Sequence, residues 1–205
     1  GPLWAKHGKA RIALPGGCAI GSRPVNFHLD ALKELGAEIN LRNGYIEASA
    51  KKLRGANIRF SGITVTGTEN LMMAATLAEG KTTLSNVAKE PEIIDLANML
   101  NSMGADIQGA GSDKIIINGV ENLIGTTFDI PADRIEAGTY LVAAAVTKGS
   151  ITIDGIDPNR LMRVIEKLRN TGANIEHTDN SITIDMDKDC PQPVDVTTAP
   201  FPEFP

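Results

Sequence analysis

An internal repeat runs through this sequence of 205 residues. Three segments each place a glycine-alanine pair after an amphipathic stretch and before an isoleucine, and their glycines are Gly36, Gly104 and Gly172. Successive glycines are 68 residues apart (36 to 104 and 104 to 172). Two further matched segments, which start at Asn70 and Thr139, are 69 residues apart (70 to 139). The chain is therefore predicted to consist of units of about 70 residues, longer than the usual solenoid repeat.

Each unit is predicted to run strand, helix, strand, helix, strand, strand. One kind of helix is amphipathic: residues 93–103 and 158–168 each place their apolar side chains on one stripe. Asp157 is expected to cap the second of these helices. Gly104 and Gly172 then fit the left-handed position that ends a helix.

The other kind of helix is apolar on nearly all sides. Residues 71–78 and 140–146 show this pattern, and we expect both segments to be buried all round. The strands at 150–156 and 181–186 alternate instead, which is typical of a sheet with one wet face. The fold class predicted from these patterns is α/β with buried helices and outer sheets, the reverse of the usual α/β barrel.

The charge balance argues against nucleic acid as a partner. The formal net charge is −5, the pI is about 5.2, and aromatic residues make up 4% of the chain. No apolar run reaches the roughly 18 residues of a membrane span, and no signal peptide opens the sequence. Cys18 and Cys190 are too few for a disulfide framework and lack metal-ligand spacing. We therefore expect a cytoplasmic protein without nucleic-acid or membrane partners, metal or cofactor.

The stretch PGGCAIGSRP, residues 15–24, places Cys18 between two glycines and a nearby arginine. Glycines give the backbone freedom and leave a thiol unshielded, and the cationic Arg23 favours the thiolate. A lone cysteine is also a common small hydrophobe in a core, so both interpretations stay open at this point. A phosphate-binding P-loop is excluded, because no Gly-Lys-Ser/Thr sequence follows the glycines.

The segments GPLWAKHGKARIALPGGCAIGSRPVNFH, AATLAEGKTTLSNVAKEPEI, DRIEAGTYLVAAAV and TTAPFPEFP together resemble the UDP-N-acetylglucosamine enolpyruvyl transferases. The resemblance covers essentially the whole chain. It implies an inside-out α/β barrel of enolpyruvyl transferase type, with two lobes of three βαβαββ units that close over the substrates. It also implies that residues 1–132 form most of the first lobe and residues 133–205 the truncated first unit of the second. We expect the chain to be an internal fragment of a protein about twice as long.

The resemblance further implies a reaction and a set of site residues. Such enzymes transfer the enolpyruvyl group of phosphoenolpyruvate to the 3-hydroxyl of UDP-N-acetylglucosamine and release phosphate, which is the first committed step of peptidoglycan synthesis. Cys18 matches the thiol that protonates the alkene, and Arg23 matches an arginine that contacts phosphoenolpyruvate. Two segments match the nucleotide-sugar site: Arg23, Pro24, Val25, Asn26 and Phe27 along the uridine part, and Gly62, Ile63, Thr64 and Val65 at the diphosphate.

Several residues near these segments have simpler interpretations. Asn26 reads equally well as the N-cap of a helix at 27–35. His28 follows the nucleotide-sugar segment, which allows a role in positioning it, but a helix histidine with satisfied ring nitrogens is the favoured interpretation. Glu90 and Glu92 flank Pro91 and are explained by the first turn of a helix. Cys190 lies in a polar turn and is given no role.

Two other functions remain as alternatives: a thiol redox protein that uses Cys18, and a non-catalytic nucleotide-sugar-binding protein of the same fold. The enolpyruvyl transferase hypothesis implies that an aspartate beyond Pro205, an amino-terminal lysine and a late arginine complete the site. The chain of 205 residues is accordingly expected to be inactive by itself. The sequence makes no prediction of oligomeric state.

Overall fold

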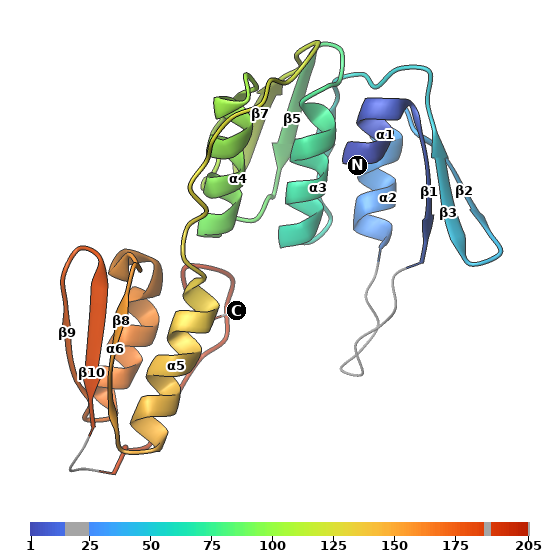
Figure 1. The fold of residues 1–205 in the computed structure, drawn as a ribbon. Helices are drawn as coiled ribbons and strands as arrows, with labels where there is room; N and C mark the ends of the chain where they lie inside the picture. The colour runs from blue at the N-terminus through green and yellow to red at the C-terminus, as the bar shows by residue number, and fades with distance from the viewer. Residues whose placement is uncertain (15–24, 187–189, 205) are drawn as a thin grey trace. The chain divides into compact units, whose positions relative to one another are not determined.

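The structure is a computed structural model that describes residues 1–14, 25–186 and 190–204 of the chain. The chain divides into two compact units, Gly1–Phe128 and Asp129–Pro205 (Figure 1). No helix among the described residues is long and apolar enough to cross a membrane.

The middle of the chain contains one whole copy of the predicted βαβαββ unit. Its four-stranded sheet has the order β4-β5-β7-β6, in which β4 and β5 are parallel and the other neighbours antiparallel. Helices α3 and α4 lie along the same face of this sheet in Figure 1. The elements are β4 (Asn57–Arg59), α3 (Val65–Ala75), β5 (Lys81–Ser85), α4 (Pro91–Ser102), β6 (Asp106–Gln108) and β7 (Lys114–Asn118).

Two further sheets repeat the last three strands of that arrangement. Their orders are β1-β3-β2 and β8-β10-β9, which correspond to β5-β7-β6, and all their neighbours are antiparallel. The first sheet and its helices comprise α1 (Pro2–His7), β1 (Lys9–Ala13), α2 (Asn26–Glu34), β2 (Glu38–Arg42) and β3 (Tyr45–Ser49). The last comprises α5 (Arg134–Val146), β8 (Ser150–Asp154), the 3-10 turn η1 (Pro158–Leu161), α6 (Met162–Asn170), β9 (Asn174–His177) and β10 (Ser181–Asp185). The repeat predicted from sequence is confirmed.

The three repeated glycines end equivalent helices in the same way. Gly36, Gly104 and Gly172 have φ values of 93°, 97° and 97°. In each of the three repeats the amide of the following alanine donates to a carbonyl five residues back, as in Ala105 N to Leu100 O at 3.0 Å. This is the left-handed helix stop that glycine adopts without steric cost. The same pattern recurs at Ala37 with Leu32 and at Ala173 with Leu168, at 3.1 and 3.3 Å.

Residues 71–78, predicted to be buried all round, are mostly buried, although α3 ends at Ala75 and Met73 and Leu77 are half-buried. Leu71, Met72, Ala74 and Ala75 are fully buried, and the polar Thr76 is buried with them. Thr76 is satisfied because its hydroxyl donates to the Met72 carbonyl at 2.9 Å. Small side chains on this helix let neighbouring elements approach closely.

Helix α5 differs from its prediction. Leu141 and Ala145 are buried, but Tyr140, Val142 and Val146 are 55%, 44% and 67% exposed. The prediction that residues 140–146 are buried all round is therefore wrong for this chain. The physical reason is that α5 packs on one side only, against β8, β10, η1 and α6 of its own unit. No helix or strand covers its other face in the described part of that unit, where only the segment 201–204 lies near it.

The remaining expected elements are found with small changes at their ends. Asp157 is the expected cap, and its carboxylate accepts from the Asn159 amide at 2.9 Å. It caps a 3-10 turn, however, and α6 begins only at Met162 because Leu161 interrupts the helical backbone. The hairpin between β2 and β3 turns at Asn43 and Gly44, whose φ values are 49° and 76°. Positive φ at both positions is the type I′ turn that suits a twisted hairpin.

Candidate functional site

The amino end of α3 is built around a threonine cap. Thr64 has an extended backbone, and its side-chain oxygen accepts from the Gly67 amide at 3.2 Å. That hydroxyl keeps its own hydrogen for donation to a ligand. A side chain at Gly67 would collide with the Thr64 methyl group, so only glycine fits beneath the cap. The exposed Ile63 and the half-buried Val65 flank Thr64. The free amides of a helix amino end make this position suitable for an anion.

A second threonine fixes the same helix end to the following segment. The Thr68 hydroxyl donates to the Thr64 carbonyl at 2.7 Å and accepts from the Ala88 amide at 3.1 Å. Thr68 is fully buried, so this pair of bonds joins α3 to the segment that leads into α4. The position of Thr64 is thereby set by the core of the unit.

The amino end of α2 contributes the other predicted segment. Val25 is the N-cap and Asn26 the first helical residue, so the interpretation of Asn26 as an N-cap is wrong. The reason is that the Val25 carbonyl already accepts from the amides of His28 and Leu29, both at 3.1 Å. Asn26 is exposed, which leaves its amide side chain available to a ligand.

Phe27 brings the two predicted segments into contact. Its ring lies 3.3 Å from the point where a side chain at Gly62 would begin. Gly62 does not have a positive φ, and a side chain there would fit only closely against the Phe27 ring. Of the predicted nucleotide-sugar residues, Val25, Asn26, Phe27 and 62–65 therefore lie at the neighbouring amino ends of α2 and α3. Cys18, Arg23 and Pro24 lie outside the described residues.

His28 was not among the predicted site residues, although it joins the same two helices. Its Nδ1 lies 3.1 Å from Asn70 Nδ2, and its Nε2 lies 3.5 Å from Thr66 Oγ1. Burial lowers its pKa below the ordinary histidine value. These contacts cannot be recognised from the sequence, because the partners of His28 are about 40 residues further along the chain.

Acidic residues gather at the start of α4 and on α3. Glu90 is the N-cap of α4 and is buried, and its Oε2 has no hydrogen-bond partner within the described residues. Glu92 lies in the first turn of α4, as expected from sequence. Burial raises the pKa of Glu69 on α3, and the negative charges of Glu92 and Glu90 raise it further. Glu69 therefore faces the acids of α4.

Comparison with known proteins places the chain in a family. The family model described as EPSP synthase (3-phosphoshikimate 1-carboxyvinyltransferase) matches residues 1–205, which is the whole chain. The chain belongs to the EPSP synthase family. The predicted fold class is thereby confirmed, together with the repeated units described above.

Curated relatives of this EPSP synthase family member share more than half of their aligned residues with it. Proteins named UDP-N-acetylglucosamine 1-carboxyvinyltransferase are 56% identical in Ruthia magnifica, 55% in Vesicomyosocius okutanii and 53% in Hydrogenovibrio crunogenus. Each match covers 100% of this chain and 49% of the relative. The chain thus spans about half the length of these curated relatives.

Solved structures support the same EPSP synthase family fold. The enolpyruvyl transferase NikO from Streptomyces tendae superposes with a TM-score of 0.73 at 22% identity, over 89% of this chain and 45% of that chain. EPSP synthase from Acinetobacter baumannii superposes with a TM-score of 0.66 at 22% identity, over 90% of this chain and 45% of that chain.

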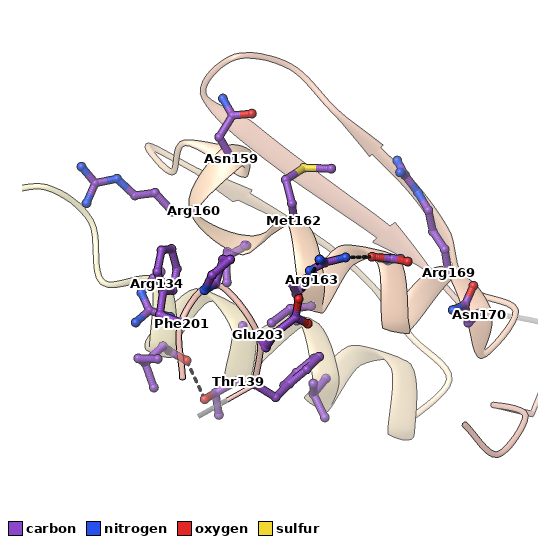
Figure 2. A pocket seen from close by; sticks show the side chains of 18 residues that line it. Arg134, Thr139, Asn159, Arg160, Met162, Arg163, Arg169, Asn170, Phe201 and Glu203 are labelled. Atoms are coloured by element: carbon purple, nitrogen blue, oxygen red, sulfur yellow. Dashed lines mark hydrogen bonds and ion pairs between the residues drawn. The ribbon is translucent and has the colours of Figure 1, made fainter. Parts of the chain in front are cut away.

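The compact unit Asp129–Pro205 contains a hollow that the sequence did not predict. It has a volume of about 820 Å³ and lies between α5, α6 and the segment 201–204 (Figure 2). Arg163 donates to Glu203 at 2.7 Å and to Glu166 at 3.0 Å, and the hydrogen bond with Glu166 is the main reason that the Arg163 pKa is raised. The Arg134 guanidinium lies 5.2 Å from the centre of the Phe201 ring. Among the described residues, none of those predicted for the site lines this hollow.

Proposed function

We propose that the full-length protein is a UDP-N-acetylglucosamine 1-carboxyvinyltransferase. It transfers the enolpyruvyl group of phosphoenolpyruvate to the 3-hydroxyl of UDP-N-acetylglucosamine and releases phosphate. The observation that supports this most directly is the identity of 53–56% to proteins of that name over the entire chain. We place the enzyme in the cytoplasm, where the sugar nucleotide and phosphoenolpyruvate are available, and assign it to peptidoglycan synthesis.

The geometry of the first unit is compatible with a nucleotide diphosphate. The amides at the start of α3 and the Thr64 hydroxyl supply donors for phosphate oxygens. Phe27 supplies a half-buried aromatic surface next to that helix end, and Asn26 an exposed amide that can pair with a base edge. In this proposal the uridine part lies along 25–27 and the diphosphate along 62–65.

Cys18 and Arg23 are proposed to act on phosphoenolpyruvate. The Cys18 thiol donates a proton to the terminal alkene carbon while the sugar hydroxyl adds to the adjacent carbon and gives its own proton to the aspartate expected beyond Pro205. The Arg23 guanidinium binds the phosphate group and favours the thiolate form of Cys18 when the proton has left. In the elimination that follows, the Cys18 thiolate takes a proton back from the methyl carbon and inorganic phosphate leaves. The enolpyruvyl product therefore forms without a redox cofactor or metal.

The decisive experiment measures phosphate release by the full-length protein with both substrates present. We expect release only when phosphoenolpyruvate and UDP-N-acetylglucosamine are present together, and we expect Cys18→Ala to abolish it. Cys190→Ala is the matched control, because Cys190 is an exposed free thiol in the other unit. Tight nucleotide-sugar binding without phosphate release would contradict the proposal and favour a non-catalytic binding protein.

Covalent labelling provides a second test of Cys18. An epoxide phosphonate such as fosfomycin carries its phosphonate where the phosphate of phosphoenolpyruvate binds, and its epoxide can alkylate a thiolate. We expect mass spectrometry of the full-length protein to find the adduct on Cys18, formed faster when UDP-N-acetylglucosamine is present. Arg23→Ala should slow the reaction, because it removes the anion contact and the cation beside the thiol. An adduct on Cys190 would contradict the assignment, and so would a labelling rate that is the same with and without the nucleotide sugar.

A further inference from the structure

A buried hydroxyl lies behind the helix end that carries the proposed diphosphate residues. Thr68 belongs to α3, one turn after the N-cap Thr64, and is fully buried. Its Oγ1 accepts from the Ala88 amide at 3.1 Å and donates to the Thr64 carbonyl at 2.7 Å. Both partners are backbone groups, and a backbone amide can only donate while a carbonyl can only accept. The direction of both hydrogen bonds is therefore fixed by the partners themselves.

The Thr64 carbonyl is held by two hydrogen bonds from the same residue. Besides the Thr68 hydroxyl, the Thr68 amide donates to it at 3.1 Å. A carbonyl oxygen has two lone pairs, so these two bonds use both of them. The Thr64 carbonyl and the Val65 amide belong to one planar trans peptide group, in which the C=O and N–H bonds point in opposite directions. Whatever fixes this carbonyl therefore also fixes the direction of the Val65 N–H.

The Val65 amide has no acceptor inside its helix. Val65 is the first residue of α3, and the amides of a first turn lack a carbonyl partner within the helix. The Thr64 hydroxyl accepts from the Gly67 amide, which leaves the Val65 N–H for a phosphate oxygen in the proposed function. The Ala88 amide, the Thr68 hydroxyl and the peptide group before Val65 then form one row of hydrogen bonds, in which every donor points towards the anion. Donors aligned in this way polarise one another.

The segment in which this row begins is also tied to the chain just before α3. Asn86 has a φ of 57°, and its Nδ2 donates to the Phe60 carbonyl at 2.8 Å. Phe60 directly precedes residues 61–64, and its own amide donates to the Ser85 carbonyl at 3.1 Å. Residues 61–64 are thus held at both ends by residues 85–88, at one end through Phe60 and at the other through Thr68.

We propose that Thr68 is a positioning residue for the nucleotide diphosphate: its hydroxyl links the Ala88 amide to the Thr64 carbonyl and so orients the Val65 N–H towards the phosphate. This inference rests on the proposed function for the identity of the ligand, whereas the row of hydrogen bonds lies within one compact unit and does not depend on it. Thr68 is fully buried and contacts no substrate. Its effect is therefore expected in the binding of the sugar nucleotide and not in the chemical step.

Three variants of the full-length protein separate this role from a merely structural one. Thr68→Val keeps the shape of the side chain and removes both hydrogen bonds, whereas Thr68→Ser keeps the hydroxyl and removes only the methyl group. Thr76→Val is the matched control, because Thr76 is also fully buried and lies at the carboxyl end of α3. Its hydroxyl likewise donates to the carbonyl four residues earlier, at 2.9 Å. All three changes are expected to lower the urea midpoint of unfolding.

The KM for UDP-N-acetylglucosamine is expected to rise in Thr68→Val alone. The rise should be about five-fold, the effect of losing one neutral hydrogen bond. The values of kcat and of the KM for phosphoenolpyruvate should stay those of the wild type, because Cys18 and Arg23 are assigned to that substrate. Thr68→Ser and Thr76→Val should keep the wild-type KM for the sugar nucleotide although both lose stability.

The row of hydrogen bonds can also be tested in the wild type, by NMR titration of the full-length protein with UDP. The protein is labelled with ¹⁵N at alanine and valine, and the Val65 and Ala88 amide signals are assigned by their loss in Val65→Ile and Ala88→Gly. We expect both amide protons to move downfield, Val65 because it donates to the phosphate and the buried Ala88 because the row transmits the polarisation. The Val120 amide, which donates to the Thr76 carbonyl at 2.8 Å, should not move.

The outcomes separate the inference from the proposed function. A KM for the sugar nucleotide that rises as much in Thr68→Ser or Thr76→Val as in Thr68→Val would overturn the positioning role, and so would a Val65 signal that ignores UDP or moves without Ala88. If Thr68→Val does not fold, the titration of the wild type decides alone. A protein that binds UDP-N-acetylglucosamine but releases no phosphate would overturn the proposed function. In that case calorimetric affinity for the sugar nucleotide replaces KM, and it must fall in Thr68→Val and persist in Thr68→Ser for the inference to stand.

Discussion

Thr64 and Gly67 show how closely a ligand-binding helix end depends on a residue that contacts no ligand. The Gly67 amide donates to the Thr64 oxygen and so orients the hydroxyl, whose hydrogen is left for a phosphate. The methyl group of Thr64 occupies the space that any side chain at position 67 would need. The glycine thus sets the orientation of a proposed binding group one helical turn away.

Gly67→Ala is expected to destabilise the protein, although alanine usually favours a helix. The added methyl group forces the Thr64 cap to move, which should cost about 1–3 kcal/mol in the free energy of unfolding. Chemical denaturation measures this, and affinity for UDP-N-acetylglucosamine should fall in parallel. Gly125→Ala is a suitable control, because its side chain would meet no atom within 4 Å. Equal stability of the two variants would contradict the steric argument.

At this scale the sequence could predict local hydrogen bonds, but not contacts between residues far apart in the chain. The pattern at Asp157 correctly predicted a cap, because that bond is made two residues away. The pattern at Asn26 suggested a cap that Val25 provides instead. The contacts of Phe27 with Gly62 and of His28 with Asn70 join positions far apart in sequence, and no local pattern reveals them.

At the scale of elements, the helix stops were the most predictable feature because a stop depends only on its neighbouring residues. Gly104 and Gly172 have the same φ of 97°, and a side chain at either position would meet no atom within 4 Å. The exposed face of α5 was not predictable, since it depends on which elements pack nearby.

Gly104→Ala and Gly172→Ala should therefore lower the free energy of unfolding of their respective compact units by nearly equal amounts. The cost is conformational only, about 1–2 kcal/mol for an alanine in the left-handed region. Chemical denaturation of each unit measures it. A large difference between the two losses would show that the units are not equivalent at this position.

The exposed face of α5 gives a second prediction at this scale. In the chain 1–205, Val142→Asp should change the free energy of unfolding by less than about 1 kcal/mol, because Val142 is 44% exposed. In the full-length protein the same change should cost more than about 2 kcal/mol if the helix is buried all round there. Ala137→Asp is the control, since Ala137 is 5% exposed and should be destabilising in both proteins. Equal small effects of Val142→Asp in both would contradict burial of this helix.

At the scale of the whole molecule, two separate hydrophobic cores divide the chain. One core draws on residues of Gly1–Phe128, and the other on residues of Asp129–Pro205. Residues 125–133 between them form no helix or strand and are mostly exposed. The overall class of fold followed from the repeat in the sequence, and the boundary between the two cores lies close to the division at 132 and 133 that the family resemblance implied.

The chain 1–205 should therefore unfold in two steps. Trp4 is the single tryptophan, is 1% exposed and lies in the first core, so its fluorescence reports that unit alone. Circular dichroism reports the helices of both units. We expect the two signals to have different midpoints in urea, with the smaller second core melting first. Coincident transitions, in the wild type and in Gly172→Ala alike, would show that the two cores unfold as one.

The type I′ turn at Asn43 and Gly44 has a chemical consequence. Glycine after asparagine leaves the backbone nitrogen of residue 44 unshielded, so it can attack the side-chain amide carbon of Asn43 and expel ammonia. The resulting ring opens to aspartate or isoaspartate, which adds one negative charge and, in the second case, an extra backbone carbon within a two-residue turn. Stored protein should therefore age at the β2–β3 hairpin, and the age of a preparation should be readable there as a mass increase of about one dalton.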